Sequence, residues 1–208
     1  LHQEGYKFLA ISTFLTFILW FLSGFFSFIF LVITIWVYYF FRDPERKIIQ
    51  NDEYLVSPAD GVISAISEVQ GPIELGLENK KFTRVSIFMN IFDCHVNRSP
   101  STGQIDDIFY KPGKFLNASL DKASEENERN FFKIKDQKTD DFIVVVQIAG
   151  LVARRIVTQV EKKQTVAQGQ RLGMIRFGSR VDIYYNQRKT IVKVGQNMIS
   201  GESLIARF

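Results

Sequence analysis

The sequence predicts a mostly β soluble domain that follows an N-terminal α-helical membrane hairpin. Residues 8–41 form an uninterrupted run of 34 residues without a charged side chain, which is typical of membrane segments. From residue 51 onward, short runs rich in β-branched and aromatic residues alternate with glycine and proline, as in strands joined by turns. These two observations divide the chain into an anchor and a β domain.

The charge-free run is too long for one untilted span of a bilayer. As a single straight helix it would be ~51 Å long, whereas the hydrocarbon core of a bilayer is ~30 Å thick. Ser23 and Gly24 lie near its middle and favour a break in the helix. We therefore expect a helical hairpin, whose arms either span the bilayer near the short limit or dip into it without crossing.

Basic residues flank the run on both sides. Lys7 precedes it, and Arg42, Arg46 and Lys47 follow it. Because the cytoplasmic flanks of membrane segments are enriched in Lys and Arg, we expect both ends of the hairpin, and the soluble domain, on the cytoplasmic side of the cell membrane. A cleaved signal peptide does not fit, because the apolar run is too long and no small-residue cleavage pattern follows it.

A proline marks the boundary between the two parts. Pro44 ends the helical pattern, and Asp43 before it is biased toward an extended conformation. We place the membrane anchor at residues 1–41 and the soluble domain at residues 42–208. A buried core helix is the alternative interpretation of the apolar run, and its 34 uncharged residues disfavour it.

The soluble domain contains five runs with strand character. Each is short, rich in β-branched or aromatic residues, and bounded by turn-forming residues. They are Val62–Ile66, Arg84–Met89, Ile143–Ile148, Arg155–Val160 and Val181–Tyr185. A helical period competes only near Ala118–Glu128, inside the polar segment Tyr110–Gln137. That segment is either a solvated loop or a flap of groups that pair with a phosphate and a carboxylate.

A weak repeat favours a barrel-sandwich-like arrangement of this domain. The segment Val166–Ile175 resembles Val194–Ile205, and both carry a Gly-Gln step. Together with Ser57–Ile63, these segments look like the half-sheets of the barrel-sandwich found in biotinyl and lipoyl carrier domains. The repeat bears on the fold alone, because two copies of a Gly-Gln turn arise readily by chance.

Composition limits the class of partner. The formal net charge of +4 fits a protein that rests on an anionic membrane surface. The sequence carries no recognised nucleic-acid motif, so we expect no nucleic-acid partner. The single cysteine, Cys94, excludes an intrachain disulfide. No cluster of His, Cys and Asp has the spacing of metal ligands, so we expect no metal.

The step from Gly178 to Ser179 is the strongest candidate for chemistry. It lies between two strand-like runs, where a tight turn is expected. Glycine has no Cβ, so the Ser179 hydroxyl could attack the Gly178 carbonyl and convert the amide into an ester. Elimination from that ester would leave a pyruvoyl group on a new N-terminus. A Gly-Ser pair is also a common turn, so this step does not decide the function by itself.

Seven motifs, in order along almost the whole chain, carry a resemblance to a known family. They are Phe41–Arg46, Ser57–Gly61, Asp93–Pro100 with Gly103, Lys114–Leu120, Asn127–Arg129, Ala153–Arg155 and Arg176–Arg180. Each motif alone is a poor signal, whereas their order and spacing together are specific. The chain resembles the phosphatidylserine decarboxylase family, in its short, membrane-anchored form.

The resemblance implies a pyruvoyl-dependent enzyme that is made from a self-cleaving precursor. Cleavage between Gly178 and Ser179 gives a beta chain of residues 1–178 and an alpha chain of residues 179–208, in which Ser179 becomes the pyruvoyl group. That group forms a Schiff base with phosphatidylserine, which loses CO₂ and leaves as phosphatidylethanolamine, without metal or pyridoxal phosphate. The implied partners are the phospholipid membrane, the substrate and the two cleaved chains; a homodimer is left open.

The resemblance also implies a Ser–His–Asp triad for self-cleavage. A serine hydroxyl is a weak nucleophile until a base takes its proton. The sequence has two histidines, and His2 precedes the membrane run, so His95 is the favoured base and Asp60 its orienter. The alternatives are a core histidine bonded to backbone and a turn-forming aspartate within Pro58–Gly61.

One position departs from the longer members of the family. They carry two histidines ahead of the proline in this segment, and here the second position holds Arg98. Whether His95 serves self-cleavage, decarboxylation or both therefore stays open. For the phosphate or carboxylate of the substrate we expect Arg180, with Arg98, Asn127 and Arg129 as further contacts. A strand-surface charge is the alternative for Arg180.

Two other classes of protein fit parts of the sequence. The first is a membrane-anchored carrier or adaptor module with a barrel-sandwich core and no catalysis, but the lysine motifs that accept biotin or lipoate are missing from the sequence. The second is a serine hydrolase that uses Ser179 and keeps its chain intact. An intact-mass measurement separates both from a self-cleaving enzyme.

Overall fold

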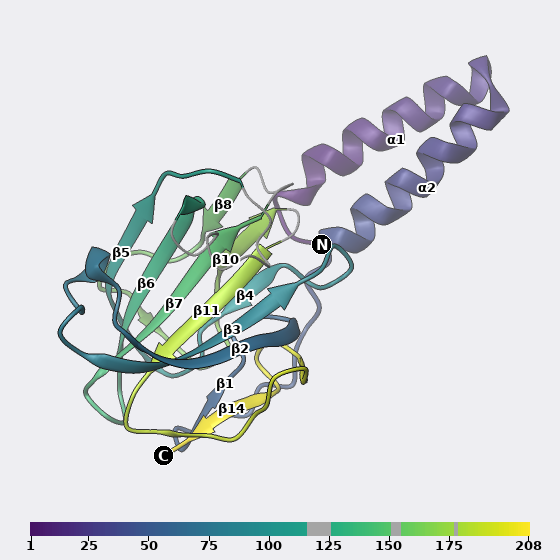
Figure 1. Ribbon diagram of the computed structural model, residues 1–208. Helices are drawn as coiled ribbons and strands as arrows, with labels where there is room; N and C mark the ends of the chain where they lie inside the picture. Colours follow the sequence, from purple (N-terminus) through teal and green to yellow (C-terminus); the bar gives the residue numbers. More distant parts are fainter. Residues whose placement is uncertain (116–125, 151–154, 177–178) are drawn as a thin grey trace. The chain divides into compact units, whose positions relative to one another are not determined.

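A computed structural model shows two compact units (Figure 1). It describes residues 1–115, 126–150, 155–176 and 179–208. The first unit comprises Leu1–Glu45 with Phe92–Cys94, and the second comprises Arg46–Ile91 with His95–Phe208. The helical period expected over Ala118–Glu128 falls largely outside the described residues, as does most of the motif Lys114–Leu120.

The first unit is a helical hairpin. Helix α1 spans Gly5–Leu22 and helix α2 spans Gly24–Phe40. Ser23 separates them in an extended conformation (φ −164°, ψ 116°), and its N–H donates to the carbonyl of Leu19 to end α1. The predicted break at Ser23 and Gly24 is thus confirmed.

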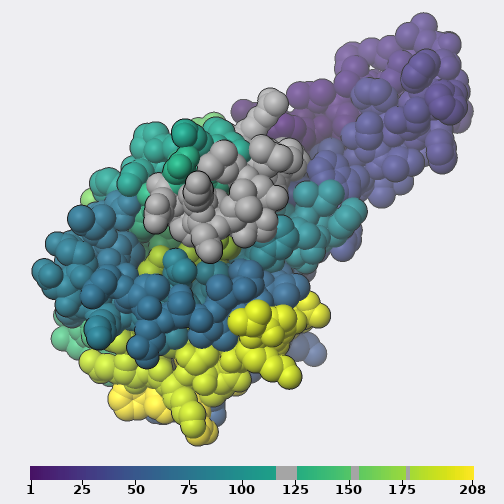
Figure 2. Space-filling view, in the orientation of Figure 1, coloured from purple at the N-terminus to yellow at the C-terminus, as the bar shows by residue number. Residues whose placement is uncertain are grey.

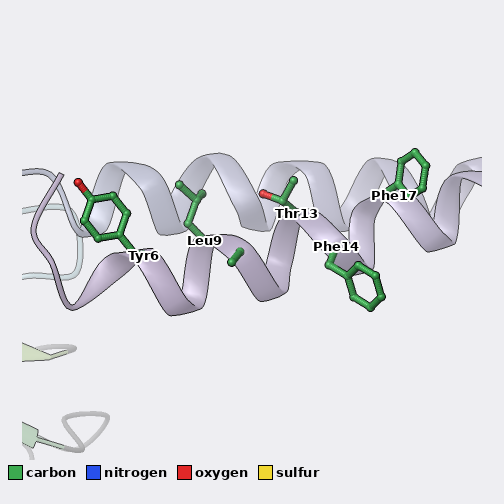
Figure 3. Close-up of a pocket in the computed structure, with 6 residues that line it drawn as sticks. Tyr6, Leu9, Thr13, Phe14 and Phe17 are labelled. Carbon is green, nitrogen blue, oxygen red and sulfur yellow. The ribbon is translucent and has the colours of Figure 1, made fainter.

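The two helices meet through small polar side chains and expose their large apolar ones. The hydroxyls of Thr16 and Thr34 lie 3.1 Å apart, and Ser27 Oγ donates to the Thr16 carbonyl at 3.2 Å. A hollow of about 580 Å³ lies along α1 and is lined by Tyr6, Leu9, Ala10, Thr13, Phe14 and Phe17. Most of these side chains are labelled in Figure 3. Small polar residues between helices and apolar residues outside are typical of membrane helices. By length and composition α1 can cross a membrane, whereas α2 is shorter, so the hairpin is compatible with membrane anchoring.

The open end of the hairpin is closed by aromatic stacking and by one arginine. The rings of Phe8 and Phe41 stack with centroids 5.2 Å apart. The Arg42 guanidinium lies 3.9 Å from the centre of the Tyr39 ring and donates to the Phe92 carbonyl at 2.8 Å. The loop Phe92–Cys94 therefore belongs to this unit.

The second unit contains an eight-stranded, fully antiparallel sheet that curls into a half-barrel (Figure 1). Its order is β13 (Asn197–Met198), β2 (Gly61–Gln70), β3 (Lys81–Met89), β11 (Ser179–Tyr185), β7 (Phe142–Ala149), β6 (Arg129–Asp136), β5 (Gly103–Lys111) and β9 (Thr165–Val166). The runs predicted near residues 62, 84, 143 and 181 are β2, β3, β7 and β11. In Figure 2 the blue surface of β2 lies beside the yellow C-terminal segment, in agreement with the pairing of β2 with β13.

Two smaller sheets complete the described part of this unit. The first has the order β1 (Tyr54–Val56), β14 (Leu204–Arg207) and β12 (Lys189–Thr190). The second has the order β4 (Val96–Arg98), β10 (Arg171–Arg176) and β8 (Arg155–Thr158), and β8 is the fifth strand that the sequence predicts. A 3₁₀ turn, η1 (Ile73–Leu75), joins β2 to β3. The mostly β fold class is confirmed.

Apolar side chains cover both faces of the large sheet. Successive residues of a strand point to opposite faces, so a strand buried on both reads as a continuous apolar run, as Phe142–Ala149 does. The larger cluster includes Ile87, Met89, Val145, Val181 and Ile183. The smaller cluster, on the other face, comprises Leu75, Leu77, Phe82, Phe131, Val144, Val146 and Ile148.

The two segments of the weak sequence repeat share a structural pattern, although their Gly-Gln steps do not correspond, because Gly169 follows β9 whereas Gly195 precedes β13. Strand β9 leads through Gly169 into β10, and β13 leads through Gly201 into β14. Both glycines have positive φ, of 77° and 79°, which L-residues with a Cβ rarely adopt. Each copy is therefore a two-residue strand, a left-handed glycine turn and a longer strand.

Gly61 → Ala is expected to destabilise the β unit by about 3 kcal/mol or more. Gly61 has φ 138°, and an added Cβ would meet the Phe88 carbonyl oxygen at 2.1 Å. Gly76 → Ala is the control, since Gly76 also has positive φ but open space around it, and about 1 kcal/mol is expected there. Urea unfolding followed by circular dichroism measures both, and equal losses would contradict the steric argument.

Candidate active site

Several predicted residues lie where the strands β2, β3, β11, β7 and β6 of the large sheet begin or end, all at the same end of the sheet (Figure 1). This row of strand ends is called the site edge. Because neighbouring strands are antiparallel, the starts of β2, β11 and β6 lie beside the ends of β3 and β7. Ser179 pairs with Met89 on one side and Ala149 on the other. Asp60 directly precedes β2, and Arg129 begins β6. The edge thus unites residues that are far apart in the sequence.

Ser179 is fully buried at the first position of β11. Its hydroxyl lies 3.4 Å from Sδ of Met89, which accepts a weak hydrogen bond. Direct partners across a sheet share a face, so Ser179 points to the side of Met89 and Ala149, where the larger apolar cluster lies. Its partner in the predicted cleavage step, Gly178, lies outside the described residues. Because Ser179 is fully buried, its hydroxyl is shielded from bulk water.

His95 is fully buried and directly precedes β4. Its carbonyl accepts a hydrogen bond from the Ile175 N–H at 3.3 Å, on the strand that runs toward Ser179. Asn97 of β4 donates to the Met89 sulfur at 3.7 Å, the same sulfur that Ser179 contacts. Two separate links therefore bring the segment of His95 to the segment of Ser179.

Asp60 is held on both carboxylate oxygens. Arg46 Nη2 lies 2.7 Å from Oδ2, and the Ser200 N–H donates to Oδ1 at 2.8 Å. The turn that carries Asp60 is joined to β4, because the Arg98 N–H donates to the Pro58 carbonyl at 2.9 Å. The side chain of Asp60 thus binds two residues that are distant in the sequence and, among the described residues, makes no hydrogen bond within its own turn. Its position directly before β2 places it beside the strand ends that carry Ser179.

Arg98 is buried and contacts protein backbone. Its Nη1 donates to the carbonyl of Gly169 at 3.0 Å. An added Cβ at Gly201 would lie 3.2 Å from its Cδ, so the side chain passes between the two glycine turns. Arg98 thus links β4 to both copies of the structural repeat.

Arg180 points to the opposite face from Ser179, because neighbours on a strand alternate. Its Nη2 donates to Asp182 Oδ2 at 3.2 Å, and its Nε lies 2.9 Å from Oδ1. Burial, together with the charge of Asp182, raises the pKa of Tyr184 to about 12. Arg180 is therefore part of a buried charged group and does not lie on the strand surface.

Arg129 lies in the same cross-strand row as Arg180, through Ile148. Its Nη2 is 3.2 Å from Glu74 Oε1, and Lys111 Nζ is 2.9 Å from the same oxygen. Burial alone would raise the pKa of Glu74, but the hydrogen bond from Lys111 and the charge of Arg129 contribute to a net pKa below its ordinary value. Arg129 and Arg180, both expected to contact the substrate, thus each pair with a carboxylate of the protein itself.

Asn127 is the expected substrate contact that reaches the strands next to Ser179 most directly. Its side-chain amide donates to the Ala149 carbonyl at 2.7 Å, and Ala149 pairs with Ser179. The N–H of Ala149 donates to the Glu128 carbonyl. The segment before β6 is therefore fixed at the site edge by backbone and side chain together.

Comparison with known proteins decides the family. The sequence profile of the family described as phosphatidylserine decarboxylase matches residues 33–206. The chain is 60% identical over 207 residues to the phosphatidylserine decarboxylase proenzyme of Pelagibacter ubique, covering 100% of this chain and 96% of the relative. The proenzymes of Ruegeria pomeroyi and Cereibacter sphaeroides are 48% and 49% identical, over 99% of this chain and 94% and 89% of theirs.

The chain belongs to the phosphatidylserine decarboxylase family. It is therefore an enzyme of the carboxy-lyase class, and the interpretations as a non-catalytic carrier module or a serine hydrolase are set aside. The name proenzyme, which the three relatives carry, describes a precursor.

A buried chain of amides lies beside the site of this decarboxylase and was not among the residues predicted from the sequence. Gln147 donates to Asn97 Oδ1 at 2.8 Å, and Asn130 donates to Gln147 Oε1 and to Thr158 Oγ1, each at 3.2 Å. Asn97, Gln147 and Asn130 are almost fully buried. The glutamine at position 147, inside the apolar run Ile143–Ile148, could have indicated this network from the sequence, because a buried amide needs hydrogen-bond partners. The network joins β4 to β7 and β6 and so fixes the strand that follows His95.

Gln147 → Leu is expected to lower the free energy of unfolding by about 1–3 kcal/mol, because it leaves a buried acceptor on Asn97 without its donor. Gln104 → Leu is the matched control, since Gln104 is exposed on β5, and a change within about 0.5 kcal/mol is expected there. Urea titrations measure both. Similar small losses in the two variants would show that the amide network is not required for stability.

Glu74 → Gln is expected to destabilise the protein at neutral pH and to lose its effect in acid. The folded-state pKa of Glu74 is lowered, so its ionised form stabilises the fold above the unfolded pKa, and this stabilisation disappears as the pH falls below about 4. Unfolding titrations from about pH 7 down to about pH 2 test this. Glu78 → Gln, exposed on the same connection, serves as control; a difference that grows in acid would contradict the sign.

Proposed function

We propose that this enzyme decarboxylates phosphatidylserine to phosphatidylethanolamine and CO₂ with a pyruvoyl group formed at Ser179 when the chain cleaves itself after Gly178. The observation that carries the proposal is the position of Ser179. It is the buried first residue of a central strand, at the edge where Asp60 and the segment of His95 meet. Family membership and the proenzyme names of the relatives support it.

Self-cleavage needs a base, and His95 is proposed for that role. His95 takes the hydroxyl proton of Ser179, and Oγ attacks the Gly178 carbonyl, so the C–N bond breaks and an ester forms. Loss of the Ser179 Cα proton then expels the Gly178 carboxylate. The remaining dehydroalanine takes up water and releases ammonia, which leaves the ketone. Asp60 orients the His95 ring throughout.

The surroundings of Ser179 fit a small uncharged group. The residue is fully buried against the Met89 sulfur and an apolar cluster, and the same sulfur accepts a hydrogen bond from the neutral amide of Asn97. A pyruvoyl group supplies a ketone that bonds the substrate amine and accepts the electron pair left by CO₂. His95 is proposed to return the proton to Cα of the product.

The phosphate and carboxylate of the substrate need cationic or amide donors. Asn127, Arg98, Arg129 and Arg180 remain the proposed contacts. Asn127 is favoured, because it binds the backbone carbonyl of Ala149, the cross-strand partner of Ser179. The ion pairs of Arg129 and Arg180 must rearrange before either binds a substrate anion.

The two products of cleavage would stay together. In the proposal β11 belongs to residues 179–208, and it pairs on both sides with β3 and β7 of residues 1–178. Strands β13 and β14 of the shorter chain likewise pair with β2 and β1 of the longer one. The hairpin is proposed to anchor this assembly in the cell membrane with the β unit on the cytoplasmic side.

Ser179 → Ala is expected to give a single uncleaved chain without activity, whereas the wild type gives two chains of residues 1–178 and 179–208. The reason is that alanine has no nucleophile to form the ester. Intact-mass spectrometry and a CO₂-release assay with phosphatidylserine vesicles measure both effects. Cleavage of the alanine variant would defeat the proposal, as would an active wild-type enzyme with an intact backbone.

His95 → Ala and Asp60 → Asn are each expected to slow self-cleavage, by roughly 10²–10⁴-fold for the loss of the base. Pulse-labelled synthesis followed by gel separation of the chains gives the rates. Lys189 → Ala, on the exposed start of β12, is a control that should cleave at the wild-type rate. Unchanged rates in both site variants would contradict the proposed roles of His95 and Asp60, but they would not contradict self-cleavage at Ser179.

A further inference from the structure

The contact between Arg46 and Asp60 is the feature that the proposed function leaves unexplained. Arg46 Nη2 lies 2.7 Å from Asp60 Oδ2, and the side chains are only 14% and 13% exposed. The other carboxylate oxygen accepts the N–H of Ser200 at 2.8 Å. Charge-assisted hydrogen bonds of this length are among the strongest in proteins. Arg46 is the last residue of a motif, Phe41–Arg46, to which no role is assigned above.

We propose that Arg46 is a positioning residue of the self-cleavage site and acts by fixing the carboxylate of Asp60. This inference rests on the proposed function, in which Asp60 orients His95. The terminal torsion of an aspartate is broad and roughly two-fold, so a carboxylate without fixed partners turns freely. Arg46 and Ser200 bind one oxygen each, from chain segments that are far apart, and together they stop that rotation.

The two contacts leave room for the function of Asp60. An ionised carboxylate offers about four lone-pair positions on its two oxygens. Arg46 and the Ser200 N–H use two of them, so acceptor capacity remains for a third donor such as an imidazole N–H. Arg46 therefore orients the carboxylate without blocking it.

Arg46 is itself held in place by the segment that it begins. The Lys47 N–H donates to Glu202 Oε1 at 2.9 Å, and the Asn51 N–H donates to Gln168 Oε1 at 2.9 Å. Gln50 Nε2 also donates to the Gln168 carbonyl at 3.1 Å. The segment 46–51 is thus bound to both glycine turns of the structural repeat, which gives Arg46 a fixed base from which to reach Asp60.

A second buried ion pair, between Arg188 and Asp136, lies away from the proposed site and can be compared with the pair of Arg46 and Asp60. Arg188 Nη2 lies 2.8 Å from Asp136 Oδ2, and the two side chains are 1% and 2% exposed. Asp136 ends β6, so this pair is at the end of the strand opposite to Arg129 and the site edge. Arg188 therefore provides a matched control, since its removal breaks a short buried pair without touching Asp60.

The test measures self-cleavage of the full-length chain during cell-free synthesis in the presence of phospholipid nanodiscs. Labelled methionine reports both products, because Met89 and Met174 fall in residues 1–178 and Met198 in residues 179–208. Arg46 → Gln is expected to slow cleavage by about tenfold to a hundredfold, the effect of losing one hydrogen bond to a charged group. Arg46 → Lys restores the charge without the guanidinium fork and should cleave several-fold more slowly than wild type, but faster than the glutamine variant.

A double variant separates positioning from stability. If Arg46 acts through Asp60, adding Arg46 → Gln to Asp60 → Asn should slow cleavage no further than Asp60 → Asn alone. Arg188 → Gln should lower the melting temperature and leave the cleavage rate unchanged. Melting curves identify any variant that does not fold; if Arg46 → Gln is one, the lysine variant decides, and a rate below wild type supports the proposal.

Three results would overturn the inference. Wild-type rates in both Arg46 variants would show that Arg46 does not position the site, while self-cleavage itself would stand. Additive slowing in the double variant would show that Arg46 acts independently of Asp60. An uncleaved wild-type chain would defeat the proposed function together with this inference, and it is distinguished from the first two results because no variant comparison is then needed.

Discussion

The insertion of β11 between β3 and β7 is the constraint on which the rest of the structure depends. A central strand has both of its backbone edges paired, so its register is fixed from two sides. That register sets Ser179 opposite Met89 and Ala149 and turns its side chain into the larger apolar cluster. A slip by one residue would send Ser179 to the other face and bring Arg180 into its place. The strand pairing therefore decides which side chain faces the larger apolar cluster at this position.

Polar side chains inside the β unit complete what the strand pairing begins. The amides of Asn97, Gln147 and Asn130 join three strands through buried hydrogen bonds, each of which is costly to leave unmade. At the neighbouring edge, Asp60 is held by a guanidinium and a backbone N–H. Both groups connect the segments beside Ser179 to distant parts of the chain, and both remain intact if the backbone is cut ahead of Ser179, because none of their contacts involves that bond.

Near the site, the buried polar groups on the two faces of the large sheet differ in kind. Near Ser179 the buried network is made of the neutral amides of Asn97, Gln147 and Asn130. On the other face, Arg129 pairs with Glu74 and Arg180 pairs with Asp182. This division explains why residues chosen from their type alone, such as Arg180, did not all fall beside the serine.

The sequence by itself determined the helical hairpin with its break at Ser23, five of the strands and the family motifs, because these features depend on local hydrophobic periodicity and turn chemistry. It missed the long strands β5 and β6, and β6 lies inside the segment Tyr110–Gln137 that was expected to be a loop or a flap. Only the tertiary structure decided that Arg46 reaches Asp60, that Gln147 bonds to Asn97, and that Arg180 faces away from Ser179. Those contacts depend on which strands are neighbours and in which register they pair. Periodicity describes the two faces of one strand, but it does not specify the strand that lies beside it, so the partners of buried polar groups emerge only when the sheet is assembled.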